Sequence, residues 1–171
     1  PVLLSGRIQS HTNNDDVIYD DEARALNIKL EENIPASWFK ERKITLTLPD
    51  GVMIRGFSYK NSNFGDKSKE TSWTDVPISD KDGGNKTTNV ASQGTIKYTE
   101  SDRSSTLELS GFQAHDKPLD KKAKFEFKLW VSIEPGFEGD VAITADGPGM
   151  AYEKQSVVIA KAQTPVKVTT Q

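Results

Sequence analysis

The chain has 171 residues, of which 35% are hydrophobic and 27% are charged, with a formal net charge of −3 and no cysteine. This acidic balance provides no basic field to attract nucleic acid or an anionic membrane, so both are disfavoured as partners. The lack of cysteine excludes thiolate metal sites and thiol catalysis. No apolar stretch approaches the roughly 18–20 residues of a membrane-spanning helix, and the length predicts a single domain over residues 1–171.

The N-terminal part contains two predicted strands, at residues 2–8 and 24–31, because apolar and polar residues alternate there. A polar loop separates them, and its acidic residues form two small clusters: Asp15, Asp16, Asp20 and Asp21. Carboxylate oxygens are the ligands that calcium prefers, so this loop is a candidate calcium site. The alternative, which we favour, is a solvated loop, because acidic runs usually form exposed surface and no 12-residue calcium-loop spacing is present.

Residues 43–59 form a predicted hairpin around Pro49-Asp50-Gly51. Proline presets the backbone of such a turn and glycine accepts a positive φ. Before it, Ser37 is expected to cap one short helical turn over residues 38–41.

A long polar excursion follows at about residues 60–94, with few apolar residues. Such a length without structure is unusual in a compact domain, so it is either a functional excursion or contains short strands that the pattern does not reveal. Asp80, Asp82 and Asn85 resemble part of a calcium loop that lacks its terminal acidic residue. They form a second candidate calcium site, with an ordinary loop as the alternative.

The C-terminal half is the most regular part of the chain. A second hairpin is predicted over residues 95–109, and a long strand over residues 124–133 with one apolar face. Trp130 is the one large apolar residue on the polar face of that strand, and we expect it to pack. Further alternating runs at residues 141–145 and 156–160 predict an antiparallel meander with the long strand, and residues 164–169 a last short strand.

About ten closely spaced strands with little helix predict an all-β fold. We expect an antiparallel β-sandwich of immunoglobulin-like or jelly-roll-like type, with a closed barrel as the alternative.

No catalytic motif is present. The two histidines, His11 and His115, lie far apart in polar stretches, and no nucleophile-elbow, phosphate-loop or zinc-protease motif occurs. Flat aromatic rings stack on sugars, so Trp73, with Tyr59 and Phe64 as neighbours, is the candidate ligand-binding group. The alternative for such residues is a partly buried structural anchor.

Two stretches resemble a known group of proteins. Residues 28–54, IKLEENIPASWFKERKITLTLPDGVMI, combine a strand, a proline-containing link and a Leu-Pro-x-Gly-Val turn. Residues 139–165, GDVAITADGPGMAYEKQSVVIAKAQTP, combine Gly-Asp-Val, a glycine-containing turn and a valine-rich strand. Together they cover about a third of the chain and resemble the N-terminal extracellular β-rich regions of Gram-positive stalk-domain or copper-amine-oxidase-N-terminal-domain-like surface proteins.

The resemblance implies a secreted bacterial module associated with the cell wall or a surface layer (S-layer). It does not imply amine oxidase chemistry, because two scattered histidines cannot supply a three-histidine copper site.

We therefore predict a non-enzymatic extracellular module with a structural or adhesive role at the cell surface, with self-assembly into a surface layer or fibre as one form. The alternative is a carbohydrate-binding module that uses exposed aromatic residues. The expected partners are a cell-wall polymer, a polysaccharide or other surface proteins, and no cofactor is expected other than calcium. The terminal strands, at residues 2–4 and 166–168, either pair within their own domain, which we favour, or fill the sheet edge of a neighbour.

Overall fold

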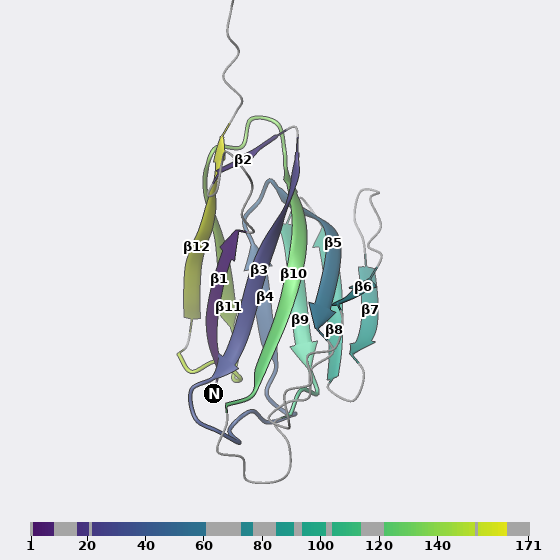
Figure 1. Cartoon of the computed structure of the whole chain (residues 1–171), viewed down its shortest axis with the longest axis vertical. Coiled ribbons are helices and arrows are strands. Elements are labelled where there is room, and N and C mark those ends of the chain that lie inside the picture. The colour runs from purple at the N-terminus through teal and green to yellow at the C-terminus, as the bar shows by residue number, and fades with distance from the viewer. Residues whose placement is uncertain are drawn as a thin grey trace, which may run out of the picture.

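The computed structural model describes residues 2–8, 17–20, 22–60, 73–76, 85–90, 94–101, 104–113, 122–152 and 154–163. Within these residues twelve strands form two sheets and no helix occurs (Figure 1). The predicted all-β antiparallel sandwich is therefore confirmed. None of the described residues belongs to a helix long and apolar enough to cross a membrane.

The first sheet has five strands, all antiparallel to their neighbours. Their order is β1 (Val2–Ile8), β3 (Ala23–Glu32), β10 (Lys124–Ile133), β5 (Val52–Lys60) and β6 (Trp73–Val76). The predicted strands at residues 2–8, 24–31 and 124–133 are thus confirmed.

The second sheet has seven strands. Their order is β2 (Val17–Tyr19), β12 (Lys154–Gln163), β11 (Gly139–Asp146), β4 (Ile44–Leu48), β9 (Ser104–Ser110), β8 (Gly94–Ser101) and β7 (Asn85–Val90). Among the described pairs of strands only β2 and β12 run parallel, and an isolated parallel bridge joins Val2 to Met150. The predicted hairpin at residues 95–109 is confirmed as β8 and β9, and the polar excursion contains β6 and β7.

The core lies between the two sheets. Alternation along β10 buries five large apolar side chains: Phe125, Phe127, Leu129, Val131 and Ile133, none more than 2% exposed. Aromatic rings continue this layer, with centroids 5.7 Å apart between Phe57 and Phe127 and 5.2 Å apart between Phe112 and Phe125. One connected cluster of buried side chains draws on both sheets. The organisation of the whole chain as one domain stays a prediction.

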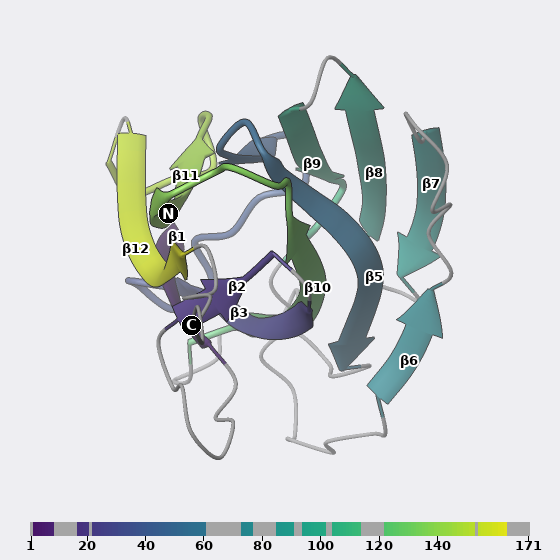
Figure 2. The ribbon, with the colours of Figure 1, turned by 90° about the horizontal axis from the view of Figure 1, so that it is seen from above.

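The two sheets approach each other at both sides, as Figure 2 shows from above. On one side β1 lies against β12, where a Cβ on Gly6 would stand only 2.8 Å from the Cδ1 atom of Ile159. On the other side, Val76 of β6 and Lys86 of β7 line the same small cavity. The closed barrel, which was the alternative to the predicted sandwich, is not formed, because the hydrogen-bonded strands make two separate sheets.

The prediction of a hairpin over residues 43–59 is wrong. The turn itself exists, with Gly51 at a φ of 91°, but β4 pairs with β9 and β11 while β5 pairs with β10 and β6. β4 and β5 each have one apolar face. The turn carries the chain from one sheet to the other, so the apolar face of each strand is buried against the opposite sheet. Pro49–Gly51 is therefore a corner between the layers.

The predicted three-stranded meander is wrong in its first pair for the same reason. β10 lies in the five-stranded sheet, whereas β11 and β12 pair in the seven-stranded sheet. Gly136 and Gly139, at φ values of 89° and 127°, carry the chain across between the layers. The pairing of the last two strands is as predicted.

The predicted helical turn at residues 38–41 is also wrong, since only Lys40 and Glu41 form a turn. The N–H groups of Ser37 and Trp38 donate to the carboxylate of Glu32 instead. Trp38 is buried, with 2% of its surface exposed, and stacks on Phe112.

The first strand pairs within its own chain. β1 pairs with β3 on one side. On its other side, the N–H of Val2 donates to the oxygen of Gly149 at 2.9 Å, and the N–H of Leu4 donates to Oε1 of Gln155 at 2.7 Å. Residues 164–169, the predicted last strand, lie outside the described residues.

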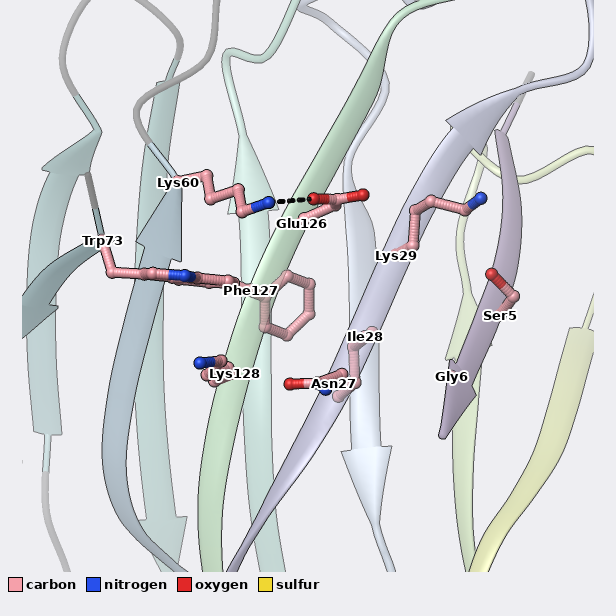
Figure 3. Close-up of a pocket in the computed structure, with 10 residues that line it drawn as sticks. All are labelled: Ser5, Gly6, Asn27, Ile28, Lys29, Lys60, Trp73, Glu126, Phe127 and Lys128. Atoms are coloured by element: carbon pink, nitrogen blue, oxygen red, sulfur yellow. Dashed lines mark ion pairs between the residues drawn. The ribbon is translucent and has the colours of Figure 1, made fainter. Parts of the chain in front are cut away.

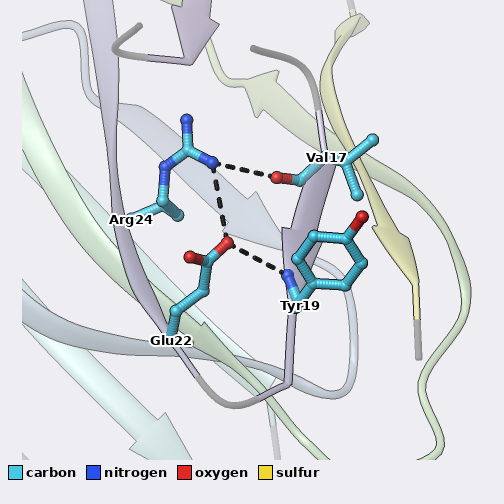
Figure 4. Close-up of polar contacts among 4 residues, drawn as sticks. All are labelled: Val17, Tyr19, Glu22 and Arg24. Carbon is cyan, nitrogen blue, oxygen red and sulfur yellow. Dashed lines mark hydrogen bonds and ion pairs between the residues drawn. The ribbon is translucent and has the colours of Figure 1, made fainter. Parts of the chain in front are cut away.

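A buried arginine near the start of β3 connects the two sheets (Figure 4). Arg24 is 4% exposed, and its Nη1 donates to the carbonyl oxygen of Val17 in β2 at 3.0 Å. The same nitrogen lies 3.6 Å from Oε1 of Glu22, which also accepts from the N–H of Tyr19. The short parallel strand β2 is thus held to β3 as well as to β12.

Candidate binding face on the five-stranded sheet

The outer face of the five-stranded sheet carries the polar half of the alternation in β10. Glu126, Lys128 and Trp130 point away from the core because their neighbours Phe127 and Leu129 point into it. Register places Lys128 directly between Asn27 of β3 and Ser58 of β5. Side chains from separate parts of the chain therefore meet on this face.

A groove of about 610 Å³ crosses this face from β1 to β6 (Figure 3). Its lining combines charged, polar and aromatic groups: Ser5, Gly6, Asn27, Ile28, Lys29, Lys60, Trp73, Glu126, Phe127 and Lys128.

Two lysines flank the indole of Trp73. The Nζ atom of Lys128 lies 4.3 Å from the ring centroid, and that of Lys60 lies 5.2 Å from it. Figure 3 shows the ring edge-on, with the two ammonium groups on opposite sides of its plane. A cation over an indole face is attracted by the ring quadrupole, so these contacts hold the three side chains in a row.

Glu126 supplies the one carboxylate among the described residues that line this groove. Its Oε2 lies 3.1 Å from Nζ of Lys60, and its Oε1 lies 3.7 Å from Nζ of Lys124. Partial burial opposes ionisation, but the hydrogen bond and charge of Lys60, with the charges of Lys124 and Lys29, lower the pKa of Glu126 below its ordinary value. The group is therefore ionised at neutral pH and is poorly suited to donate a proton.

A second hollow of about 460 Å³ lies on the other side of Trp73 and is lined by Gly56, Asp75 and Trp130, among others. Trp130 lies against Gly56, where an added Cβ would stand 3.1 Å from Cδ1 of the indole. The tryptophan nevertheless keeps 39% of its surface exposed, and Trp73 keeps 36%. The packing expected of Trp130 thus occurs on the outer face and leaves much of the ring in solvent.

Of the three predicted ligand-binding residues, only Trp73 is placed on this face. Tyr59 is 6% exposed and packs in the core near Phe57 and Phe125, because the alternation of β5 turns it inward and Lys60 outward. Phe64 lies outside the described residues. Trp73 and Tyr59 therefore do not form one exposed aromatic surface.

The predicted calcium sites fall mostly outside the described residues, which include neither Asp15, Asp16 and Asp21 nor Asp80 and Asp82. Asp20 follows β2, and the backbone of Asn85 begins β7. No group of three potential metal ligands occurs in the part of the chain that the structure describes. Calcium binding stays a prediction at both clusters.

Sequence reasoning missed Lys60, Glu126 and Lys128 as parts of a site. The alternation of β10 already indicates that Glu126 and Lys128 point outward. The position of β6 beside β5 has no comparable signal, because its four residues lie inside a polar stretch.

Comparison with known proteins gives only distant likenesses. No family model matches the chain, and no curated protein matches it. Among solved structures, it is similar to a C-terminal fragment of the major pilin GBS80 of Streptococcus agalactiae, with a TM-score of 0.46 and 10% identity over 95% of this chain. The chain spans 56% of the length of that fragment.

Two further solved structures are similar at a comparable level. AvmM, which catalyses macrocyclisation in alchivemycin A biosynthesis, gives a TM-score of 0.43 and 9% identity over 98% of this chain and 92% of its own. A DUF4466 family protein from Parabacteroides merdae gives 0.40 and 8% over 94% of this chain and 44% of its own. All three scores are too low to transfer an activity to this chain.

Proposed function

We propose that this chain is a non-enzymatic, extracellular β-sandwich module that adheres to a polysaccharide at a cell surface through the outer face of its five-stranded sheet. The observation that carries this proposal is that the groove and two exposed aromatic residues lie on the same outer face of the five-stranded sheet. Two of the three tryptophans in the chain, Trp73 and Trp130, are each more than one-third exposed there. Partly exposed aromatic groups beside polar ones are typical of binding surfaces.

The chemistry of the groove supports adhesion rather than catalysis. Hydrolysis of a glycosidic bond ordinarily uses two carboxyl groups, one of which is protonated. In the described lining of the groove the carboxyl group is that of Glu126, and the lysines around it lower its pKa. A fixed ion pair can position a ligand, but it does not supply a general acid.

A purely structural role in which a neighbouring strand is added beside the first strand has less support. β1 pairs with β3, and the side that a neighbouring strand would occupy already bonds to Gly149 and Gln155. A cell-surface location rests on the composition of the chain and on the resemblance of residues 28–54 and 139–165 to surface proteins.

The proposal is tested by retention on insoluble polysaccharides and by a glycan array. We expect Trp73→Ala and Trp130→Ala to reduce retention by roughly tenfold each, a loss of about 1–2 kcal/mol. Trp130→Ala removes an exposed aromatic ring, and Trp73→Ala removes the indole edge and the cation–π contacts that position Lys60 and Lys128. Tyr152→Ala is the matched control, since Tyr152 is 65% exposed and lies between β11 and β12 of the other sheet. Failure to retain any polysaccharide, or equal loss in all three variants, would contradict the proposal.

A further inference from the structure

We propose that the groove selects acidic polysaccharides that carry uronate carboxylates, with Lys128 as the residue that recognises the anion. This inference rests on the proposed function and narrows its ligand. Its basis is the charge of the groove, the environment of each lysine in it and the polar groups that surround them.

The charge of the groove is opposite in sign to that of the chain. The described lining contains three lysines, Lys29, Lys60 and Lys128, and one glutamate, Glu126, which gives a net charge of +2. The whole chain has a formal net charge of −3. A local positive field on an acidic protein attracts a polyanion to this face and away from the others.

The three ammonium groups differ in how far their charges are balanced. Lys60 lies 3.1 Å from Glu126, and Lys29 lies 3.9 Å from Glu31. Lys128 makes no ion pair with any residue that the structure describes, and its ammonium group lies over the indole of Trp73 in a cation–π contact. A π face attracts an ammonium group without taking up all of its N–H donors, so Lys128 remains able to donate to a carboxylate.

The surroundings of Lys128 fit a hydroxyl-bearing polymer better than a simple anion. The groove extends over five strands, and Ser5 and Asn27 add a hydroxyl and an amide to its lining. Because lysines lie on both sides of the Trp73 ring, an acidic sugar meets ammonium groups and the indole edge before it meets a bare ring face. A uronate presents its carboxylate and its hydroxyls on one ring, which matches this arrangement.

The test compares polygalacturonate with the same polymer after full methyl esterification, which removes the charge and keeps the backbone. We expect the native protein to bind the acid form at least about tenfold more tightly at low salt, and the preference to fall as ionic strength rises from about 0.05 M to about 0.5 M. Lys128→Gln should weaken binding of the acid form roughly three- to tenfold and binding of the ester clearly less, so that the ratio of the two affinities falls toward one.

The control is Lys161→Gln, which removes an exposed lysine from β12 of the other sheet and should leave both affinities unchanged. Thermal melting of each variant establishes that it is folded, and Lys29→Gln provides a second variant of the same face. Equal affinity for acid and ester, with loss in Trp130→Ala, would overturn this inference and leave the proposed function standing. Binding of duplex DNA as tight as that of polygalacturonate would also overturn it, because the groove would then recognise negative charge without regard to the sugar. Absence of binding to any glycan would overturn both.

Discussion

At the scale of single residues, Glu32 is a buried carboxylate that accepts several backbone hydrogen bonds in the core. It is 1% exposed and ends β3. Its Oε2 accepts from the N–H groups of Ser37 and Trp38 at 2.5 and 2.6 Å, and its Oε1 accepts from the N–H of Ala123 at 2.8 Å. One carboxylate thus holds the loop after β3 and the residue that precedes β10 in place by hydrogen bonds.

We predict that Glu32→Gln lowers the free energy of unfolding by about 2–4 kcal/mol. The amide keeps one acceptor and places its NH₂ group against buried N–H donors, so at least one of them loses its partner. The measurement is urea unfolding followed by tryptophan fluorescence, since Trp38 lies in this contact.

Glu31→Gln is the control for this change. Glu31 is the adjacent residue, with 37% of its side chain exposed and Lys29 at 3.9 Å. An exposed pair of this kind contributes little, so we expect a change below about 0.5 kcal/mol. Equal effects of the two substitutions would show that the buried hydrogen bonds of Glu32 do not matter.

The role of Glu32 was not predictable from the sequence. In the alternation of β3 it occupies an inward position, which indicates only that a charged residue ends a buried run. Its partners are backbone N–H groups 5, 6 and 91 residues away. Side-chain patterns carry no information about such donors, whereas the apolar face of β10 follows directly from its sequence.

At the scale of elements, the connections decide which sheet each strand joins. The turn at Pro49-Asp50-Gly51 was predicted and exists, but the sequence pattern is the same for a hairpin and for a corner between sheets. Contact with the next layer distinguishes them. A Cβ on Gly51 would stand 2.8 Å from Cδ2 and 3.2 Å from Cβ of Phe137, in the link between β10 and β11. The two corners therefore pack on each other.

We predict that Gly51→Ala lowers the free energy of unfolding by about 2–4 kcal/mol, from positive-φ strain together with displacement of Phe137. Gly136→Ala separates these causes, because Gly136 has a φ of 89° and no heavy atom within 4 Å of an added Cβ. Strain alone should cost about 1–2 kcal/mol there. Chemical denaturation of both variants gives the comparison, and equal losses would show that the contact with Phe137 contributes nothing.

The candidate site shows the same division at this scale. The alternation of β10 predicts the outward direction of Lys128 and Trp130 but not what they meet. That depends on β6, a four-residue strand in which Trp73 and Val76 flank two polar residues. Its pairing with β5 brings Trp73 to Lys60 and Lys128. A strand as short as β6 has no periodic signal, so the groove could not be predicted from the sequence.

At the scale of the whole molecule, the sandwich depends on its first strand. β1 is an edge strand of the five-stranded sheet and lies against β12 of the other sheet. Val2 is 0% exposed and Leu4 is 7% exposed, so both belong to the core. The strand covers one open side of the sandwich and also forms the end of the groove at Ser5 and Gly6.

We predict that removal of residues 1–8 destabilises the monomer rather than dissolving a polymer. Loss of two buried aliphatic side chains alone removes about 3–6 kcal/mol, a large fraction of the roughly 5–15 kcal/mol by which a domain is stable. In the full chain, Leu4→Ala should cost about 2–4 kcal/mol, and Leu3→Ala, on the half-buried outward side, clearly less. Urea unfolding and size-exclusion chromatography measure both properties. A truncated chain that keeps its stability, loses polymers formed by the full chain and binds a synthetic peptide of residues 1–8 would instead show that β1 is exchanged between copies, because only an exchanged strand leaves a stable acceptor edge behind.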